Sequence, residues 1–143
     1  MKILVSACLL GQKCKYNGGD NYSEAVAEYI KGHEIIPVCP EVEGGLPTPR
    51  IPSEIVNGVV TNAEGETVDR EFRKGAELCL KKAIKEQVDL AILQSRSPSC
   101  GVNQIYDGTF TGKLISGKGV FARLLEEKGI KAIDAEEIGN TKQ

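Results

Sequence analysis

The sequence alternates between short apolar runs, typical of β-strands, and longer stretches with helical periodicity. The clearest run is Leu90–Leu93, whose four consecutive apolar residues are typical of a strand buried on both faces of a parallel sheet. Runs at 3–7, 35–38 and 130–133 predict three further strands. Between the runs, apolar residues at helical spacing predict helices near 22–30, from Asp69 onward and from Val120 onward. The alternation predicts an α/β fold with a parallel sheet.

The length bounds the domain organisation. At 143 residues the chain fits a single domain, 1–143, which is large enough to bury a core without disulfides. We expect a Rossmann-like three-layer α/β fold with a short parallel sheet. A polar turn at 62–65 predicts a β-hairpin between 56–61 and 66–68, and Asp107-Gly108 predicts a small β-excursion around Ile105 and Phe110. The Pro-rich stretch 39–52 predicts a rigid irregular loop.

Charge and hydropathy exclude several classes of protein. Eighteen basic and twenty acidic residues give a net charge of −2, which argues against general nucleic-acid binding. No stretch approaches the roughly 20 apolar residues needed to span a membrane. The apolar run at the N-terminus is too short for a secretory signal. We therefore expect a cytoplasmic protein without a membrane partner.

The chain holds five cysteines: Cys8, Cys14, Cys39, Cys79 and Cys100. An odd count without a secretory signal argues against a disulfide framework. Cys8 and Cys39 each follow a predicted strand by one residue, and Cys100 lies in the loop after Leu90–Leu93. Loops that follow parallel strands emerge at one edge of the sheet, where ligands bind. We therefore expect these three thiols to converge.

The other two cysteines differ in character. Cys79 lies on the apolar stripe of the helix that starts at Asp69, which is typical of a small buried residue. Cys14 lies in the first loop between Lys13 and Lys15, whose charges favour a lowered thiol pKa. The residues alone leave open whether Cys14 packs the loop or takes part in chemistry.

Three convergent thiolates limit the group that they could hold. His33, the only histidine, precedes the strand 35–38 and so lies at the opposite edge of the sheet. Thiolate ligation alone suits an iron–sulfur cluster, or zinc with Cys14 as a fourth ligand or with an open position. Three ligands on a four-iron cluster leave one iron open as a Lewis acid. Three loop cysteines without any ligand are a further possibility.

Several short motifs carry a resemblance to a known family. They are Leu-Val-Ser-Ala-Cys-Leu-Leu-Gly at 4–11, Cys-Lys-Tyr-Asn-Gly at 14–18, Val-Cys-Pro-Glu at 38–41, Gly-Leu-Pro-Thr-Pro-Arg at 45–50, Ser-Pro-Ser-Cys-Gly at 97–101 and Tyr-Asp-Gly-Thr-Phe at 106–110. Together they resemble the bacterial thiouracil desulfurase family, and the resemblance extends from about 3 to 133. The Ser-Pro-Ser-Cys-Gly and Cys-Pro-Glu motifs are specific in combination.

The resemblance implies a cofactor and a reaction. Members carry a [4Fe–4S] cluster bound by three cysteines, which match Cys8, Cys39 and Cys100 here. The family removes sulfur from a small thiolated nucleobase such as thiouracil, giving uracil and hydrosulfide without net redox change. A carboxylate and a serine assist, and they match Glu41 and Ser97.

Three more residues are candidates for substrate contacts: Ser6, Arg96 and Ser99. The family pattern leads us to expect a lysine at position 94, where this chain has Gln94, and Arg96 is the nearest substitute. Arg50 ends the Pro-rich loop, where it could pair with the site carboxylate, bind substrate or form a surface salt bridge.

Two alternative functions compete with the desulfurase. One is a metal-free sulfur carrier or hydrolase in which Cys14 or Cys100 is the nucleophile. The other is a zinc-stabilised binding module without catalytic activity. Bound iron, bound zinc or the effect of alkylating one cysteine distinguishes the three.

Overall fold

Four parallel strands form the central sheet of the computed structural model, which describes residues 1–141. Their order across the sheet is β2 (Glu34–Val38), β1 (Lys2–Ser6), β5 (Leu90–Leu93) and β8 (Ala132–Asp134). All three neighbouring pairs are parallel, which confirms the predicted sheet. Pro37 lies in the edge strand β2, where its missing N–H leaves no ladder bond unmade.

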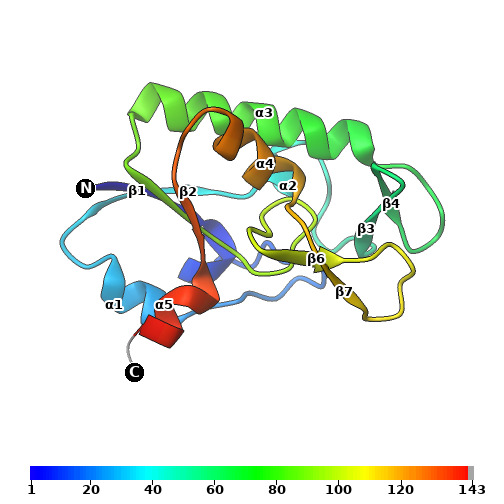
Figure 1. The fold of residues 1–143 in the computed structure, drawn as a ribbon, viewed down its shortest axis with the longest axis horizontal. Coiled ribbons are helices and arrows are strands. Elements are labelled where there is room, and N and C mark those ends of the chain that lie inside the picture. The colour runs from blue at the N-terminus through cyan, green and yellow to red at the C-terminus, as the bar shows by residue number, and fades with distance from the viewer. Residues whose placement is uncertain (142–143) are drawn as a thin grey trace.

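Helices cover both faces of the sheet (Figure 1). On one face, α3 (Asp69–Glu86) and α4 (Val120–Glu127) pack through apolar residues against Leu4 and Leu93. On the other, the 3₁₀ turn η1 (Ala7–Leu10), α1 (Glu24–Tyr29) and α5 (Ala135–Thr141) pack against Ile3 and Ile92. Alternate side chains along β1 and β5 thus pack into two hydrophobic cores, one on each face of the sheet. The predicted three-layer fold is confirmed.

The strand order creates a switch point at the carboxyl edge of the sheet. The chain leaves β1 through α1 and returns beside it as β2. It then crosses through α3 to the other side of β1, where it forms β5. Because the direction of winding reverses at β1, the crevice between the ends of β1 and β5 is where α/β sheets of this kind bind ligands.

The first hairpin lies elsewhere than the sequence predicted. Strands β3 (Ser53–Val56) and β4 (Val59–Asn62) pair around Asn57-Gly58, so the predicted turn at 62–65 is wrong as the hairpin turn. Both central residues have positive φ, 50° and 81°, which Asn-Gly adopts at low cost. Residues 62–65 do form a turn, and the segments on its two sides are joined by an isolated bridge between Thr61 and Thr67 instead of a two-stranded ladder.

The second hairpin confirms the predicted β-excursion. Strands β6 (Gln104–Tyr106) and β7 (Leu114–Ser116) pair antiparallel, and Phe110 lies in their connection rather than in a strand. Both hairpins lie together at one end of the molecule (Figure 1). Among the described residues, no helix has both the length and the apolar character needed to cross a membrane.

A short helix begins in the segment predicted to be an irregular loop. Helix α2 (Pro40–Glu43) starts directly after Cys39, with Pro40 in its first turn, where a proline loses no helical hydrogen bond. It lies against α3 so closely that a Cβ on Gly75 would overlap the carbonyl oxygen of Pro40. Gly75 therefore lets the two backbones meet, and this contact fixes where α2 holds its side chains.

The close approach predicts a large effect for a small substitution. Gly75→Ala should lower the free energy of unfolding by about 1–3 kcal/mol, because the overpacked methyl group forces α2 away from α3. Alanine also gains about 1 kcal/mol of helix propensity over glycine, which acts in the opposite direction, and the cost of the overpacked methyl group outweighs this gain. Urea unfolding measures the change, and Lys74→Ala on the exposed side of α3 is the control. A Gly75→Ala protein as stable as the control would contradict the packing argument.

Candidate active site

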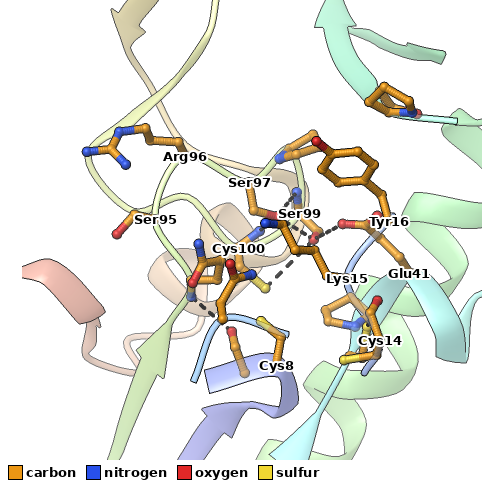
Figure 2. A pocket seen from close by; sticks show the side chains of 18 of the residues that line it. Cys8, Cys14, Lys15, Tyr16, Glu41, Ser95, Arg96, Ser97, Ser99 and Cys100 are labelled. Atoms are coloured by element: carbon orange, nitrogen blue, oxygen red, sulfur yellow. Dashed lines mark hydrogen bonds between the residues drawn. The ribbon is translucent and has the colours of Figure 1, made fainter. Parts of the chain in front are cut away.

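Three cysteines from three strand ends border one cavity. Cys8 lies in η1 directly after β1, Cys39 follows β2, and Cys100 lies in the loop after β5. The cavity measures about 630 Å³ and opens at the switch point between β1 and β5. Figure 2 shows Cys8, Cys14 and Cys100 around it. Cys100 is buried at 4% exposure, whereas Cys8 and Cys39 are half-buried.

Cys14 joins two of these thiols from the first loop. Its thiol hydrogen-bonds to Cys39 and Cys8, which lowers the pKa of Cys39 to about 7 and lowers that of Cys8. The same hydrogen bonds raise the pKa of Cys14 itself, so the expectation that its flanking lysines lower it is wrong. A thiol that donates to neighbouring sulfur stabilises its own protonated form and the thiolate form of its partner. The backbone carbonyl of Cys14 lies 4.0 Å from the Cys39 sulfur.

Burial is the main influence on the thiol pKa of the remaining two cysteines, Cys100 and Cys79. It raises the pKa of Cys100 to about 12, although hydrogen bonds from Ser6 and Ser99 favour the thiolate. Cys79 is fully buried on α3, as its place on the apolar stripe predicted, and burial raises its pKa as well. The Cys79 thiol donates to a carboxylate oxygen of Glu43 at 3.1 Å. Cys79 does not line the cavity.

The loop that carries Cys100 is built onto the start of α4. The Ser97 hydroxyl accepts the backbone N–H groups of Ser99 at 3.1 Å and Cys100 at 3.0 Å. In turn, the carbonyls of Pro98 and Ser99 accept the first N–H groups of α4, which has no side-chain cap. A Cβ on Gly119 would lie 2.6 Å from the Ser99 carbonyl oxygen, so only glycine permits this contact.

Sequence patterns give little indication of this capping role of the loop. Its only sequence signal is Gly119, which stands before the helix in the place where a serine or aspartate normally caps.

Glu41 projects from α2 into the cavity and is held at both oxygens. Arg50 donates from Nε to Oε1 at 3.0 Å, and the Ser99 hydroxyl donates to Oε2 at 2.9 Å. The side chains of Arg50 and Glu41 are only 7% and 15% exposed, so this is a largely buried ion pair rather than a surface salt bridge. Arg50 also donates to the carbonyl of Cys14 at 2.8 Å. One guanidinium therefore ties the first loop and the Pro-rich loop to the carboxylate.

The two serines of the Ser-Pro-Ser-Cys motif form a chain with a defined direction. Both lone pairs of the Ser97 oxygen are taken by backbone N–H groups, so its hydroxyl donates to Ser99 at 2.9 Å. Ser99 can then donate to Glu41. The Ser99 oxygen also lies 3.7 Å from the Cys100 sulfur. Figure 2 shows this line of hydroxyls running toward Glu41.

The other candidate residues line the same cavity with different contacts. Ser6 is buried and its hydroxyl accepts the backbone N–H of Gln94 at 3.0 Å, which ties β1 to the end of β5. Arg96 lines the cavity, but its guanidinium pairs with Glu136 of α5 at 2.6 Å. Figure 2 shows Arg96 extending away from the cysteines. Gln94, at the position where the family pattern has lysine, also lines the cavity.

The donor set fits an iron–sulfur cluster. The three thiols border a cavity, and two of them are half-buried at its wall. Among the side chains that the structure describes, no three His, Cys, Asp or Glu residues are grouped closely enough to hold a single metal ion. Thiolates spaced around a cavity suit a group that spans the gap between them, and thiolate is the usual ligand of such clusters.

Thiol reactivity tests the hydrogen bonds of Cys14. In the cluster-free protein, iodoacetamide at pH 7 should label Cys39 fastest, because a pKa of about 7 leaves about half of it as thiolate. The labelling rate should fall as the pH falls below 7, and Cys100 should stay unlabelled in the folded protein. Cys14→Ala should raise the pKa of Cys39 by about one, and the smaller thiolate fraction should slow Cys39 labelling at pH 7 at least fivefold. Peptide mass spectrometry measures each rate.

The control for this experiment is Lys13→Ala, which removes a charge beside Cys14 and leaves its thiol in place. It should leave Cys39 labelling unchanged. Equal rates in the wild-type and Cys14→Ala proteins would contradict the role assigned to the Cys14 thiol.

Comparisons with known proteins agree with this geometry. YbbK of Bacillus subtilis (strain 168), a protein described as uncharacterized, is 38% identical, and the match covers 96% of this chain and 98% of YbbK. A solved structure of TudS, described as a [4Fe-4S]-dependent thiouracil desulfidase, matches at a TM-score of 0.90 and 38% identity over 97% of this chain and 93% of TudS. The family model described as 2-thiouracil desulfurase matches residues 3–137, and the chain therefore belongs to the 2-thiouracil desulfurase family.

Proposed function

We propose that this protein is a [4Fe–4S]-dependent desulfurase that hydrolyses the thiocarbonyl group of a small thiolated nucleobase such as thiouracil. The products are uracil and hydrosulfide, and no net oxidation or reduction takes place. The observation that carries the proposal is the convergence of three thiols from β1, β2 and β5 on a cavity that also holds a fixed carboxylate. Membership in the family and the likeness to TudS support it.

The cluster ligands in this proposal are Cys8, Cys39 and Cys100. When bound, the cluster supplies an iron without a protein ligand, whose affinity for sulfur polarises the thiocarbonyl group. Backbone contacts to α3 and α4 fix the segments that carry Cys39 and Cys100, and the Cys8 carbonyl accepts the backbone N–H of Asn21 at 3.0 Å, so the ligands are preorganised. The reducing cytoplasm is the compartment that we propose, because all five cysteines are free thiols.

Glu41 acts as the general base in the proposed reaction. Its carboxylate removes a proton from the water that attacks the thiocarbonyl carbon, and the carbon–sulfur bond then breaks. Arg50 and Ser99 each occupy one carboxylate oxygen, which fixes the orientation of Glu41 and leaves lone pairs for the water. Ser97 assists by donating its hydroxyl to Ser99, which leaves the Ser99 hydroxyl to donate to Glu41.

Substrate contacts are assigned to Ser6, Ser99 and Arg96. The hydroxyls of Ser6 and Ser99 are nearly fully buried beside Cys100, where they can hydrogen-bond to a ring carbonyl or N–H group of the substrate. Arg96 must leave its ion pair with Glu136 to reach the substrate. Because that pair is partly exposed, breaking it costs little, on the order of 1 kcal/mol or less.

Iron content tests the ligand assignment. After anaerobic reconstitution with iron and sulfide, the wild-type protein should hold about four irons per chain and absorb broadly in the visible blue. The triple variant in which Cys8, Cys39 and Cys100 are all replaced by alanine should hold no cluster. Cys79→Ala, which removes a buried thiol outside the cavity, should retain the wild-type iron content.

Each alternative predicts a different result in the same samples. A triple variant that still held about four irons would refute the ligand set. Zinc in place of iron after anaerobic purification would favour the binding module. Desulfuration by iron-free protein that stops when one cysteine is alkylated would favour the metal-free nucleophile.

Glu41→Gln distinguishes the loss of the general base from the loss of the cluster. The amide is nearly isosteric but cannot accept the proton, so kcat should fall about 10²–10⁴-fold while the iron content stays unchanged. Release of hydrosulfide from thiouracil measures the rate, and Glu64→Gln on the exposed turn at 62–65 is the control. A Glu41→Gln enzyme within threefold of wild type would contradict the role of Glu41.

A further inference from the structure

The connection between β6 and β7 forms a wall of the cavity that the proposed reaction does not use. Phe110 lies in this connection and lines the same cavity as Cys8, Cys39 and Glu41. The residue is 38% exposed, so Phe110 is not part of the core. The lining of the cavity combines thiols and hydroxyls with apolar and aromatic side chains, and Phe110 belongs to its exposed part.

The backbone at Phe110 is strained. Its φ is 58°, in the left-handed region that bulky side chains rarely adopt. Strain of this kind persists only where the surrounding structure enforces it, and it gathers at functional sites. The sequence could have placed a glycine here at lower cost, as it does at Gly108 and Gly112 in the same connection, both with positive φ.

A carboxylate from the other hairpin enforces the conformation. Oε1 of Glu54, on β3, accepts the backbone N–H of Gly108 at 2.9 Å and that of Phe110 at 3.1 Å. Figure 1 shows the β6–β7 hairpin beside β3 and β4. A Cβ on Gly108 would lie 2.6 Å from the carbonyl oxygen of Ile55, so the two hairpins also meet backbone to backbone. We call these contacts the Glu54 clamp.

The connection is also ordered from within. Oδ1 of Asp107 accepts the backbone N–H of Thr109 at 3.0 Å and its hydroxyl at 2.6 Å. The Thr109 hydroxyl lies 2.6 Å from that of Thr111. With the Glu54 clamp, these bonds hold the seven residues between β6 and β7 in one conformation. The Phe110 ring is therefore presented to the cavity by a fixed support.

A rigid aromatic ring recognises flat ligands. A planar heterocycle gains stacking energy against it, whereas an acyclic thioamide has no ring face to offer. Building on the function proposed above, we propose that Phe110, held by the Glu54 clamp, is a specificity-determining residue of the site. It stacks on the ring of the substrate, so the enzyme selects thiocarbonyl groups that belong to planar heterocycles.

Binding of uracil tests the stacking without any desulfuration. Calorimetry on the cluster-loaded protein should show that Phe110→Leu raises the Kd of uracil between about 5- and 150-fold, the range measured when base stacking is removed. Phe110→Trp should stay within about twofold of wild type, because the indole keeps a flat face. Ile115→Ala is the matched control, since Ile115 is exposed on β7 of the same hairpin and does not line the cavity.

Hydrogen exchange tests the clamp separately. Glu54→Gln weakens the charge-assisted acceptor for two N–H groups, so exchange in the peptide covering 107–113 should become about tenfold faster. The Kd of uracil should rise in the same variant. Ile115→Ala should change neither quantity, and an unchanged urea midpoint shows that the variants are folded.

Specificity distinguishes this proposal from the proposed function. Phe110→Leu should lower kcat/KM for thiouracil at least fivefold relative to kcat/KM for thioacetamide. The proposal is overturned if Phe110→Leu binds uracil as tightly as wild type, if Phe110→Trp binds as weakly as Phe110→Leu, or if the wild-type protein binds no uracil. A cluster-loaded wild type that binds uracil but releases no hydrosulfide from thiouracil refutes the proposed function and leaves the stacking result standing.

Discussion

The parallel pairing of β1 with both β2 and β5 is the constraint on which the site depends. Because β1 lies between these two strands, their three carboxyl ends stand side by side, about 4.8 Å from one neighbour to the next. Cys8 and Cys39 leave the ends of β1 and β2, and the Cys100 loop leaves the end of β5. Strand order thus brings together residues 92 positions apart in sequence (100 − 8), and the β1 strand that leads to Cys8 lies between the strands that lead to Cys39 and Cys100.

The buried pair of Arg50 and Glu41 orients the site more than it stabilises the fold. A buried ion pair gains little over well-packed apolar residues, because both charges lose their hydration. Removing one partner is costly, about 3–5 kcal/mol, since the other charge is left buried. Arg50 also binds the carbonyls of Cys14 and Pro47 and the Thr48 hydroxyl. The guanidinium therefore gives Glu41 a single position relative to the first loop.

Sequence patterns predicted the features that follow from periodicity and strand order. The bounds of β5, the three layers and the meeting of Cys8, Cys39 and Cys100 at one cavity all follow from them. The patterns failed where a side chain far along the chain decides local structure. Helix α2 forms because α3 offers Gly75 as a contact, and Glu54 clamps a connection more than 50 residues away. The hairpin forms at Asn57-Gly58, which is a stronger hairpin signal than the polar turn at 62–65.

Close glycine contacts explain how three segments around the cavity become rigid. Gly75 brings α2 against α3, Gly119 brings the Cys100 loop against α4, and Gly108 brings the β6–β7 connection against β3. At each contact a Cβ would collide with a backbone carbonyl, so the elements meet without side chains between them. Backbone groups have less freedom to rearrange than side chains, so these three segments are fixed by contacts outside the cavity. Side chains that line the cavity complete the support, because Arg50, Ser97 and Glu54 hold its loops through hydrogen bonds to backbone groups.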